Sequence, residues 1–375
     1  MKPWLACQEG VTSTGIGSGV FSVRFPRCGR LAAAWGPLLA LVAGACLAQA
    51  QWLTQEITLR PGWNAVHLSV QPARNDCSSV LAGLPVESVW MWSRRTPRLH
   101  FTTDPSQLLP RNPDWLFWLP ASHPQTSLGT LFSIQGGRSY LIRLASDAPA
   151  ITWKIQGIPV VFRRQWLAQA VNLTGLPVRS AGATFEEFFR PATAIGLTRA
   201  DGGEIYQVSS TGEGTRVWEP SRTRIQPGVA YWIRCKEPTA YTGPLRVELD
   251  YGSVLEFPTG VWTRRLKLSN DGRTPSTVTV RPWPSEAAPP GSAPVAGQVP
   301  LSYREQDWSQ GLPKQIYRAL EPALSRSLAP GETWVLELTP RRQEMREVAP
   351  GASWQSLLEV TDGVTVRQWV GVVAQ

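Results

Sequence analysis

A ten-residue phrase occurs twice in this chain, at residues 134–143 and 225–234. Both copies read Ile-Gln, a turn pair that ends in Gly, two variable residues, and then Tyr, an apolar residue, Ile and Arg. A turn followed by alternating side chains predicts a β-strand with Tyr140 and Ile142 on one face and Arg143 on the other. Two copies predict a duplicated β-rich module and argue against one large enzyme domain.

The composition favours the same fold class. Apolar residues make up 42% of the 375 residues, and 33 prolines and 32 glycines are scattered between the apolar runs. This distribution favours many short strands joined by turns over long helices. The formal net charge is +9, but the basic residues are spread along the chain without a polybasic run. We therefore predict no nucleic-acid partner.

The N-terminal stretch has the pattern of a secretory signal peptide. Three arginines precede a mostly apolar run at residues 31–48, and a small-x-small sequence follows at residues 48–50, which predicts cleavage after Ala50. Residues 43–46 also resemble a bacterial lipoprotein box, in which Cys46 would become the acylated N-terminus. No later stretch is long enough to span a membrane, so we expect a secreted or cell-surface mature chain without a transmembrane span.

The residues after the leader predict two small β-rich units, at 51–160 and 161–252. Residues 52–59 and 63–70 flank an Arg-Pro-Gly turn, which predicts a hairpin. A short helix is expected at residues 78–84.

Ahead of the apolar run of the leader, residues 1–20 have no pattern, and we expect the start codon to lie downstream of them.

The second unit repeats the order of the first. Residues 166–173 share Ala-Val-x-Leu with the strand at residues 63–70, which aligns Asn172 with His67. A short helix is expected at residues 184–189, with Thr184 as its N-cap. The two short runs that follow, at residues 204–208 and 215–218, predict a hairpin.

The last unit, residues 253–375, predicts an immunoglobulin-like antiparallel β-sandwich, because strand-like runs recur there at regular spacing. Asn270-Asp271-Gly272 and Asp362-Gly363 are expected to be hairpin turns, and residues 287–297 a surface loop. The expected strands cover residues 263–268, 277–280, 333–338 and 365–370.

Five features of the sequence stand out together: Gly62-Trp63-Asn64, Trp90-Met91-Trp92, the segment at 227–232, Tyr241-Thr242-Gly243-Pro244 and the segment at 357–363. They resemble a group of uncharacterised, secreted, β-rich surface proteins of Verrucomicrobia and related bacteria. The resemblance covers nearly all of residues 51–375. It implies no known activity and no catalytic residue, and such patterns often occur within much longer surface proteins.

We predict no catalytic residue, metal site or cofactor. The chain lacks the Gly-x-Ser-x-Gly, P-loop, His-Glu-x-x-His and EF-hand patterns. His67 alternates with apolar neighbours on a predicted strand, which favours a structural role. Glu186 and Glu187 are expected on a solvated helix face. A hydrolase would need a carboxylate pair or a Ser-His contact in a pocket, and the sequence shows neither.

The two cysteines after the leader leave two alternatives open. In an oxidising compartment Cys77 and Cys235 would be able to form one disulfide. The other alternative is a pair of buried small apolar side chains, which we favour because no spacing pattern supports pairing.

The aromatic residues are the best functional lead. Trp90, Trp92, Trp115 and Trp118 cluster in the first unit, and Trp115 and Trp118 are flanked by prolines, which favours an exposed surface. The recurring tyrosines of the phrase are expected in the core. We therefore expect a non-enzymatic structural or interaction module whose partner is unknown. The alternative is carbohydrate binding through exposed tryptophans, with a surface glycan or another surface protein as partner.

Overall fold

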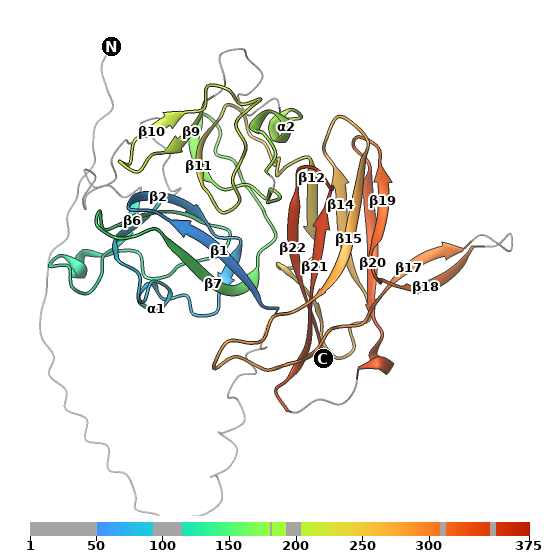
Figure 1. The fold of residues 1–375 in the computed structure, drawn as a ribbon. Helices are drawn as coiled ribbons and strands as arrows, with labels where there is room; N and C mark the ends of the chain where they lie inside the picture. Colours follow the sequence, from blue (N-terminus) through green and yellow to red (C-terminus); the bar gives the residue numbers. More distant parts are fainter. Residues whose placement is uncertain (1–50, 93–114, 181, 193–203, 308–312, 346–349) are drawn as a thin grey trace, which may run out of the picture. The chain divides into compact units, whose positions relative to one another are not determined.

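The computed structural model describes residues 51–375 except 93–114, 181, 193–203, 308–312 and 346–349 (Figure 1). The predicted signal peptide, its cleavage site and the acylation of Cys46 lie outside the described residues. The described residues are mainly β, with short helices only, and all belong to one compact unit. This confirms the predicted mainly β fold class, whereas the boundaries at residues 160 and 252 stay predictions.

Two sheets form the first part of the described chain. The three-stranded sheet has the order β1-β7-β3, and the four-stranded sheet has the order β2-β6-β4-β5. One apolar cluster joins residues of the two sheets and of the helix α1. The elements are β1 (Leu53–Leu59), β2 (Gly62–His67), β3 (Val70–Pro72), α1 (Cys77–Val80), β4 (Val86–Trp92), β5 (Trp115–Trp118), β6 (Ser139–Leu144) and β7 (Ile151–Pro159), with a 3₁₀ turn at Thr126–Leu128.

The hairpin predicted at residues 52–70 is wrong. Strand β1 pairs with β7, and β2 pairs with β6, so the turn between them carries the chain from one sheet to the other. The reason is burial on both faces of β2. Val66 enters the core shared with β1, while Trp63 and Ala65 enter a second apolar cluster on the opposite face. A strand that is buried on both faces belongs in a middle layer.

A four-stranded sheet with the order β10-β9-β11-β8 forms the second part. The predicted hairpin is confirmed as the antiparallel pair β9–β10. The predicted helix is confirmed as α2, where the Thr184 hydroxyl accepts the Glu187 N–H at 3.2 Å and the Glu187 carboxylate accepts the Thr184 N–H at 2.8 Å. The elements are β8 (Ala170–Thr174), α2 (Phe185–Phe189), β9 (Ile205–Val208), β10 (Gly214–Arg216) and β11 (Tyr231–Cys235).

Asn172 corresponds to Asn64 in its bonding, and the predicted alignment with His67 is wrong. The Asn64 side chain bonds the backbone N–H and C=O of Arg60 and also the C=O of Gly62. The Asn172 side chain bonds the N–H and C=O of Leu167 and also the C=O of Ala170. The shared Ala-Val-x-Leu letters therefore misled the alignment by three residues.

Two larger sheets form the last part and pack as a β-sandwich, with the orders β12-β14-β20-β17-β18 and β13-β22-β21-β15-β19; strand β16 pairs with β21. The pairs β13–β22 and β16–β21 are parallel, which departs from the expected antiparallel pattern. The strands are β12 (Leu245–Leu249), β13 (Val254–Phe257), β14 (Arg264–Asn270), β15 (Ser276–Pro284), β16 (Val295–Gly297), β17 (Leu301–Asp307), β18 (Lys314–Ala319), β19 (Leu324–Leu328), β20 (Thr333–Pro340), β21 (Ser353–Thr361) and β22 (Arg367–Ala374), with a 3₁₀ turn at Arg342–Glu344.

Only one of the two predicted hairpin turns of this part joins paired strands. Asp362-Gly363 connects the antiparallel pair β21–β22, as expected. Asn270-Asp271-Gly272 connects β14 to β15, which lie in different sheets, so that prediction is wrong. The Asn270 side chain accepts the Gly272 N–H and donates to the C=O groups of Thr274 and Leu328. These bonds turn the chain across the sandwich.

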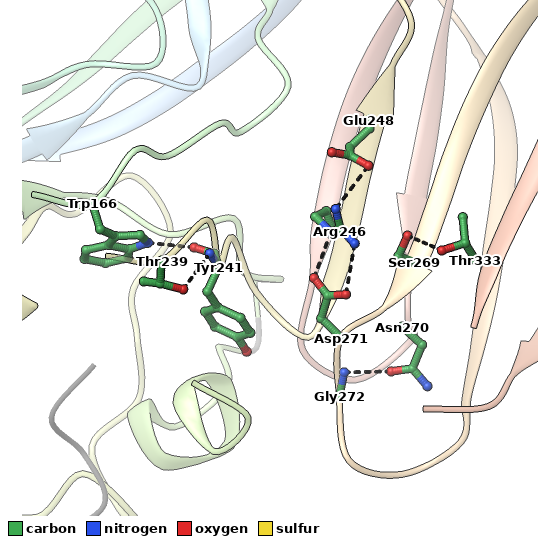
Figure 2. Close-up of polar contacts among 10 residues, drawn as sticks. All are labelled: Trp166, Thr239, Tyr241, Arg246, Glu248, Ser269, Asn270, Asp271, Gly272 and Thr333. Carbon is green, nitrogen blue, oxygen red and sulfur yellow. Dashed lines mark hydrogen bonds and ion pairs between the residues drawn. The ribbon is translucent and has the colours of Figure 1, made fainter. Parts of the chain in front are cut away.

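Polar contacts fix the entry into the sandwich (Figure 2). The indole N–H of Trp166 donates to the C=O of Tyr241 at 2.6 Å. At the start of β12, the Arg246 guanidinium lies 2.8 Å from Asp271 and 3.2 Å from Glu248, as Figure 2 shows. One apolar cluster continues from α2 and β11 into the sandwich, so these two parts share a core.

Candidate functional site

The tryptophans predicted to bind a ligand lie mostly inside the protein. Trp90 is 2% exposed and Trp115 is 4% exposed, so the expectation of an exposed Trp115 is wrong. Both rings belong to an apolar cluster between the two four-stranded sheets, where Trp115 meets Trp232 edge-on at 6.0 Å. Aromatic rings that are almost fully buried act mainly by packing in the core. The sheets need them to cover their facing apolar sides.

Trp92 and Trp118 are partly buried and lie on opposite faces of their sheet. Trp92 packs edge-on against Trp115 and belongs to the same aromatic cluster. Trp118 packs against the core beneath the other face, because successive side chains of a strand alternate. An open cleft of about 540 Å³ borders Trp90, but a ring that is 2% exposed offers no face for stacking. The four tryptophans therefore form no common binding surface.

Cys77 and Cys235 are free and buried, so the structure contains no disulfide between them. They lie in separate apolar clusters. Burial raises the pKa of the Cys77 thiol to about 11, and it also raises the pKa of Cys235. The favoured alternative, two buried small side chains, matches this arrangement.

His67 and Ser139 form the one contact that resembles a hydrolytic pair within the described part of the chain. The imidazole Nδ1 lies 2.9 Å from the Ser139 hydroxyl. The two residues face each other across β2 and β6, at 6% and 8% exposure, and His67 meets Phe162 edge-on. Ser139 does not line the cleft that His67 borders. A nucleophile must reach its substrate, so this pair has the geometry of a structural contact.

The acidic side chains of α2 also have structural partners. Glu187 completes the cap of α2, and its hydrogen bonds with Thr184 hold the pKa of that carboxyl below its ordinary value. Glu186 pairs with Arg190 at 3.4 Å. In the described residues, no group of three or more His, Cys, Asp or Glu side chains is placed to hold a metal ion. The described helices also include none with the length and apolar character needed to cross a bilayer.

Three other aromatic residues are exposed and are each stacked with an arginine, whereas Phe132, Trp283 and Tyr317 are exposed without a stacked arginine among the described residues. Trp218 is 70% exposed, Tyr251 is 74% exposed and Trp262 is 60% exposed. The guanidinium carbons of the stacked arginines lie 4.6–5.8 Å from the ring centroids, within the range of cation–π attraction. The pairs are Arg216–Trp218, Arg264–Tyr251 and Arg342–Trp262. The sequence did not indicate these three residues. The signal was a cluster of tryptophans close together in the sequence, and the tryptophans of that cluster pack inside the protein.

The arginine of the last pair is itself fixed in place. Arg342 donates to the backbone C=O groups of Phe257, Pro258 and Val261 at 2.9–3.1 Å. Its guanidinium lies over the ring of Trp262, the residue that follows Val261. An exposed aromatic ring that lies against a fixed guanidinium is suited to contact with a partner.

No family model matches this chain, and no curated protein sequence is similar to it. It is similar to two solved structures, the CsuC-CsuE chaperone-tip adhesion subunit pre-assembly complex from Acinetobacter baumannii and the CupB2 chaperone of Pseudomonas aeruginosa. The identities are 16% and 17%, and the TM-scores are 0.19 and 0.20. Each match covers 34% of this chain and about half of the other chain, 55% and 54%.

Proposed function

We propose that this chain is a secreted or cell-surface interaction module without catalytic activity, which binds another surface protein through its exposed arginine-stacked aromatic residues. The observation that carries the proposal is the set of three such pairs, Arg216–Trp218, Arg264–Tyr251 and Arg342–Trp262. Trp, Tyr and Arg are the residue types that dominate the binding energy of protein interfaces. Stacking orders these side chains in advance, which lowers the entropy cost of binding.

The packing inside the protein supports a rigid scaffold for the arginine-stacked pairs. Backbone hydrogen bonds join the first part to the second, from Trp63 to Ser210 at 2.9 Å and from Ala230 to Ala65 at 3.0 Å. The matching bonds of Asn64 and Asn172 support a duplicated module as the origin of these two parts. Secretion rests on the leader sequence, as stated above.

The alternative, glycan binding by Trp90, Trp92, Trp115 and Trp118, has less support. Stacking on a sugar requires an accessible ring face, and two of these rings are at most 4% exposed. We therefore do not propose it for these residues.

The test measures retention of the protein at the cell surface. Cells that produce the full chain with its own leader are washed, and bound and released protein are compared between the wild type and the triple variant Trp218→Ala/Tyr251→Ala/Trp262→Ala. We expect at least about tenfold weaker retention, because a single hot-spot side chain contributes roughly 2 kcal/mol.

The matched control is Tyr317→Ala, since Tyr317 is 57% exposed and no arginine is stacked on it among the described residues. It should bind as the wild type does. Equal retention of the triple variant and the wild type, or a wild-type protein confined to the cell interior, would overturn the proposal.

A further inference from the structure

Gln51 directly follows the predicted cleavage site, and it is 0% exposed. Its side chain lies against Gly371 of β22, where a β-carbon would come within 2.6 Å of the Gln51 Oε1 and 3.0 Å of its Cδ. A glycine inside a strand often marks a place where another part of the chain approaches closely. Residue 51 is therefore packed against the β-sandwich.

Hydrogen bonds with the segment after β15 hold the chain next to Gln51 in place. The Trp52 N–H donates to the Ser285 hydroxyl at 2.9 Å, and the Trp52 C=O accepts the Glu286 N–H at 3.0 Å. The Glu286 carboxylate accepts the N–H and the hydroxyl of Thr54 at 2.9 Å and 2.6 Å. Because these bonds fix residues 52 and 54, they also fix the place where the chain reaches residue 51.

The side-chain amide of Gln51 is not satisfied in this position. Its Nε2 and its Oε1 are both buried, and neither has a hydrogen-bond partner among the described residues. The carboxylate of the neighbouring segment, Glu286, is already bonded to Thr54. A buried donor without a partner costs free energy, so loss of the amide nitrogen would remove one such cost.

Cleavage after Ala50 adds a second cost at the same residue. The new α-amine of Gln51 is an ammonium at neutral pH, and an unpaired buried charge costs far more than a buried neutral group.

An N-terminal glutamine removes both costs in one intramolecular reaction. The neutral α-nitrogen attacks the side-chain Cδ, and the N–Cδ bond of a five-membered lactam forms. The Cδ–Nε2 bond breaks, and Nε2 leaves as ammonia after taking one proton from the α-nitrogen. Nothing is oxidised or reduced, and no co-reactant is consumed.

From these features we infer that Gln51 is a modification site, where the mature chain begins with a pyroglutamyl residue packed against Gly371. The lactam keeps the carbon atoms and the Oε1 of the side chain, and it loses the unpartnered nitrogen and the charge. The inference rests on the secretion that is part of the proposed function. It is incompatible with acylation at Cys46, because the acylated chain would begin at residue 46.

The test starts from cells that produce the full chain with its own leader, and it measures the mass of the N-terminal peptide of the mature protein. Most mature chains should begin at residue 51 and be lighter than the glutamine form by one ammonia. Gln51→Asn is the matched variant, because its amide is one methylene too short to close a five-membered ring. It should begin at the same residue with a free amine, which an amine-specific label detects.

A second measurement tests whether the lactam is buried. Pyroglutamyl aminopeptidase should remove residue 51 from the isolated N-terminal peptide but not from the folded protein. In Gly371→Ala the added methyl group needs the space that the side chain of residue 51 occupies. The folded variant should therefore lose its lactam at least tenfold faster than the folded wild type.

An N-terminal Gln51 with a free amine overturns the inference and leaves secretion standing. A chain that begins at any other residue overturns it through the cleavage site, and rapid removal of the lactam from the folded wild type overturns the burial. If Gly371→Ala fails to fold, the mass and the protection of the wild type decide. Retention at the cell surface is measured separately, so failure of the arginine-stacked contacts is distinguishable from failure here.

Discussion

The phenolic oxygen of Tyr231 accepts the backbone N–H of Gln226 at 2.8 Å. In the first phrase, Tyr140 accepts the N–H of Gln135 at 2.7 Å. Both tyrosine side chains are at most 1% exposed, and burial raises the pKa of each to about 12. Each phrase therefore ties the start of its turn to the strand that follows, which explains the fixed spacing between Gln and Tyr.

Replacement of this hydroxyl should destabilise the fold. In Tyr231→Phe the ring stays, but the Gln226 N–H loses its acceptor, and we expect a loss of about 1–3 kcal/mol in the free energy of unfolding. Urea denaturation followed by far-ultraviolet circular dichroism measures this loss. Tyr317→Phe, at an exposed position, is the control and should stay within about 0.5 kcal/mol of the wild type. Equal stabilities of the two variants would show that the hydroxyl bond contributes nothing.

The cysteine thiols should resist modification in the folded protein. The pKa of about 11 leaves Cys77 with roughly a hundredfold less thiolate at pH 8 than its ordinary value of 9.0 would give. Iodoacetamide should label the peptides of Cys77 and Cys235 only after denaturation. This labelling should need no reducing agent, because both thiols are free. Mass spectrometry reads this directly. A disulfide-linked peptide pair would contradict the two free thiols.

The two kinds of tryptophan should differ sharply in their effect on stability. Trp232 is 6% exposed between the two four-stranded sheets, and Trp232→Ala should cost about 3–5 kcal/mol. Trp218 is 70% exposed and is stacked only with Arg216 among the described residues, and Trp218→Ala should cost no more than about 1 kcal/mol. Chemical denaturation of both variants makes the comparison. A Trp232→Ala variant as stable as the wild type would show that the aromatic cluster does not stabilise the fold.

Acid should weaken the cap of helix α2. The folded-state pKa of Glu187 is lowered, so its contribution to stability is present above the unfolded value near 4.5 and is lost as the pH falls through the folded value. Glu187→Gln keeps a capping amide without the charge. The wild type should be the more stable at pH 6, and the difference in melting temperature should shrink below about pH 4. A difference that does not change with pH would contradict this role.

The sequence predicted the strands better than their partners. Asp362-Gly363 and Asn270-Asp271-Gly272 carry similar turn signals, yet only the first joins two strands of one sheet. A turn motif specifies a local reversal, whereas the sheet that a strand joins depends on which of its faces are buried. The turn before β2 was misassigned for this reason, since both faces of β2 are apolar.

The candidate site was harder to predict than the fold. Trp115 and Trp118 differ by three positions on one strand, so their rings face opposite sides of a sheet that is covered on both. The prolines that flank Trp115 and Trp118 do not indicate that both faces of this sheet are covered by other parts of the protein. The arginine stacked on Trp262 comes from a position 80 residues later, Arg342, and a contact of that separation leaves no local pattern. Such contacts between residues far apart in the sequence become visible only in the structure.

The central claim is that arginine-stacked, exposed aromatic residues form the contact surface, and site-specific photo-cross-linking tests it most directly. A photoreactive phenylalanine derivative replaces Trp262 in one variant and Gln315, an exposed residue of β18, in the control. On cells that display the protein, position 262 should give a discrete adduct that excess unmodified protein suppresses, and position 315 should give none. Absence of an adduct at position 262, or equal adducts at both positions, would contradict the account.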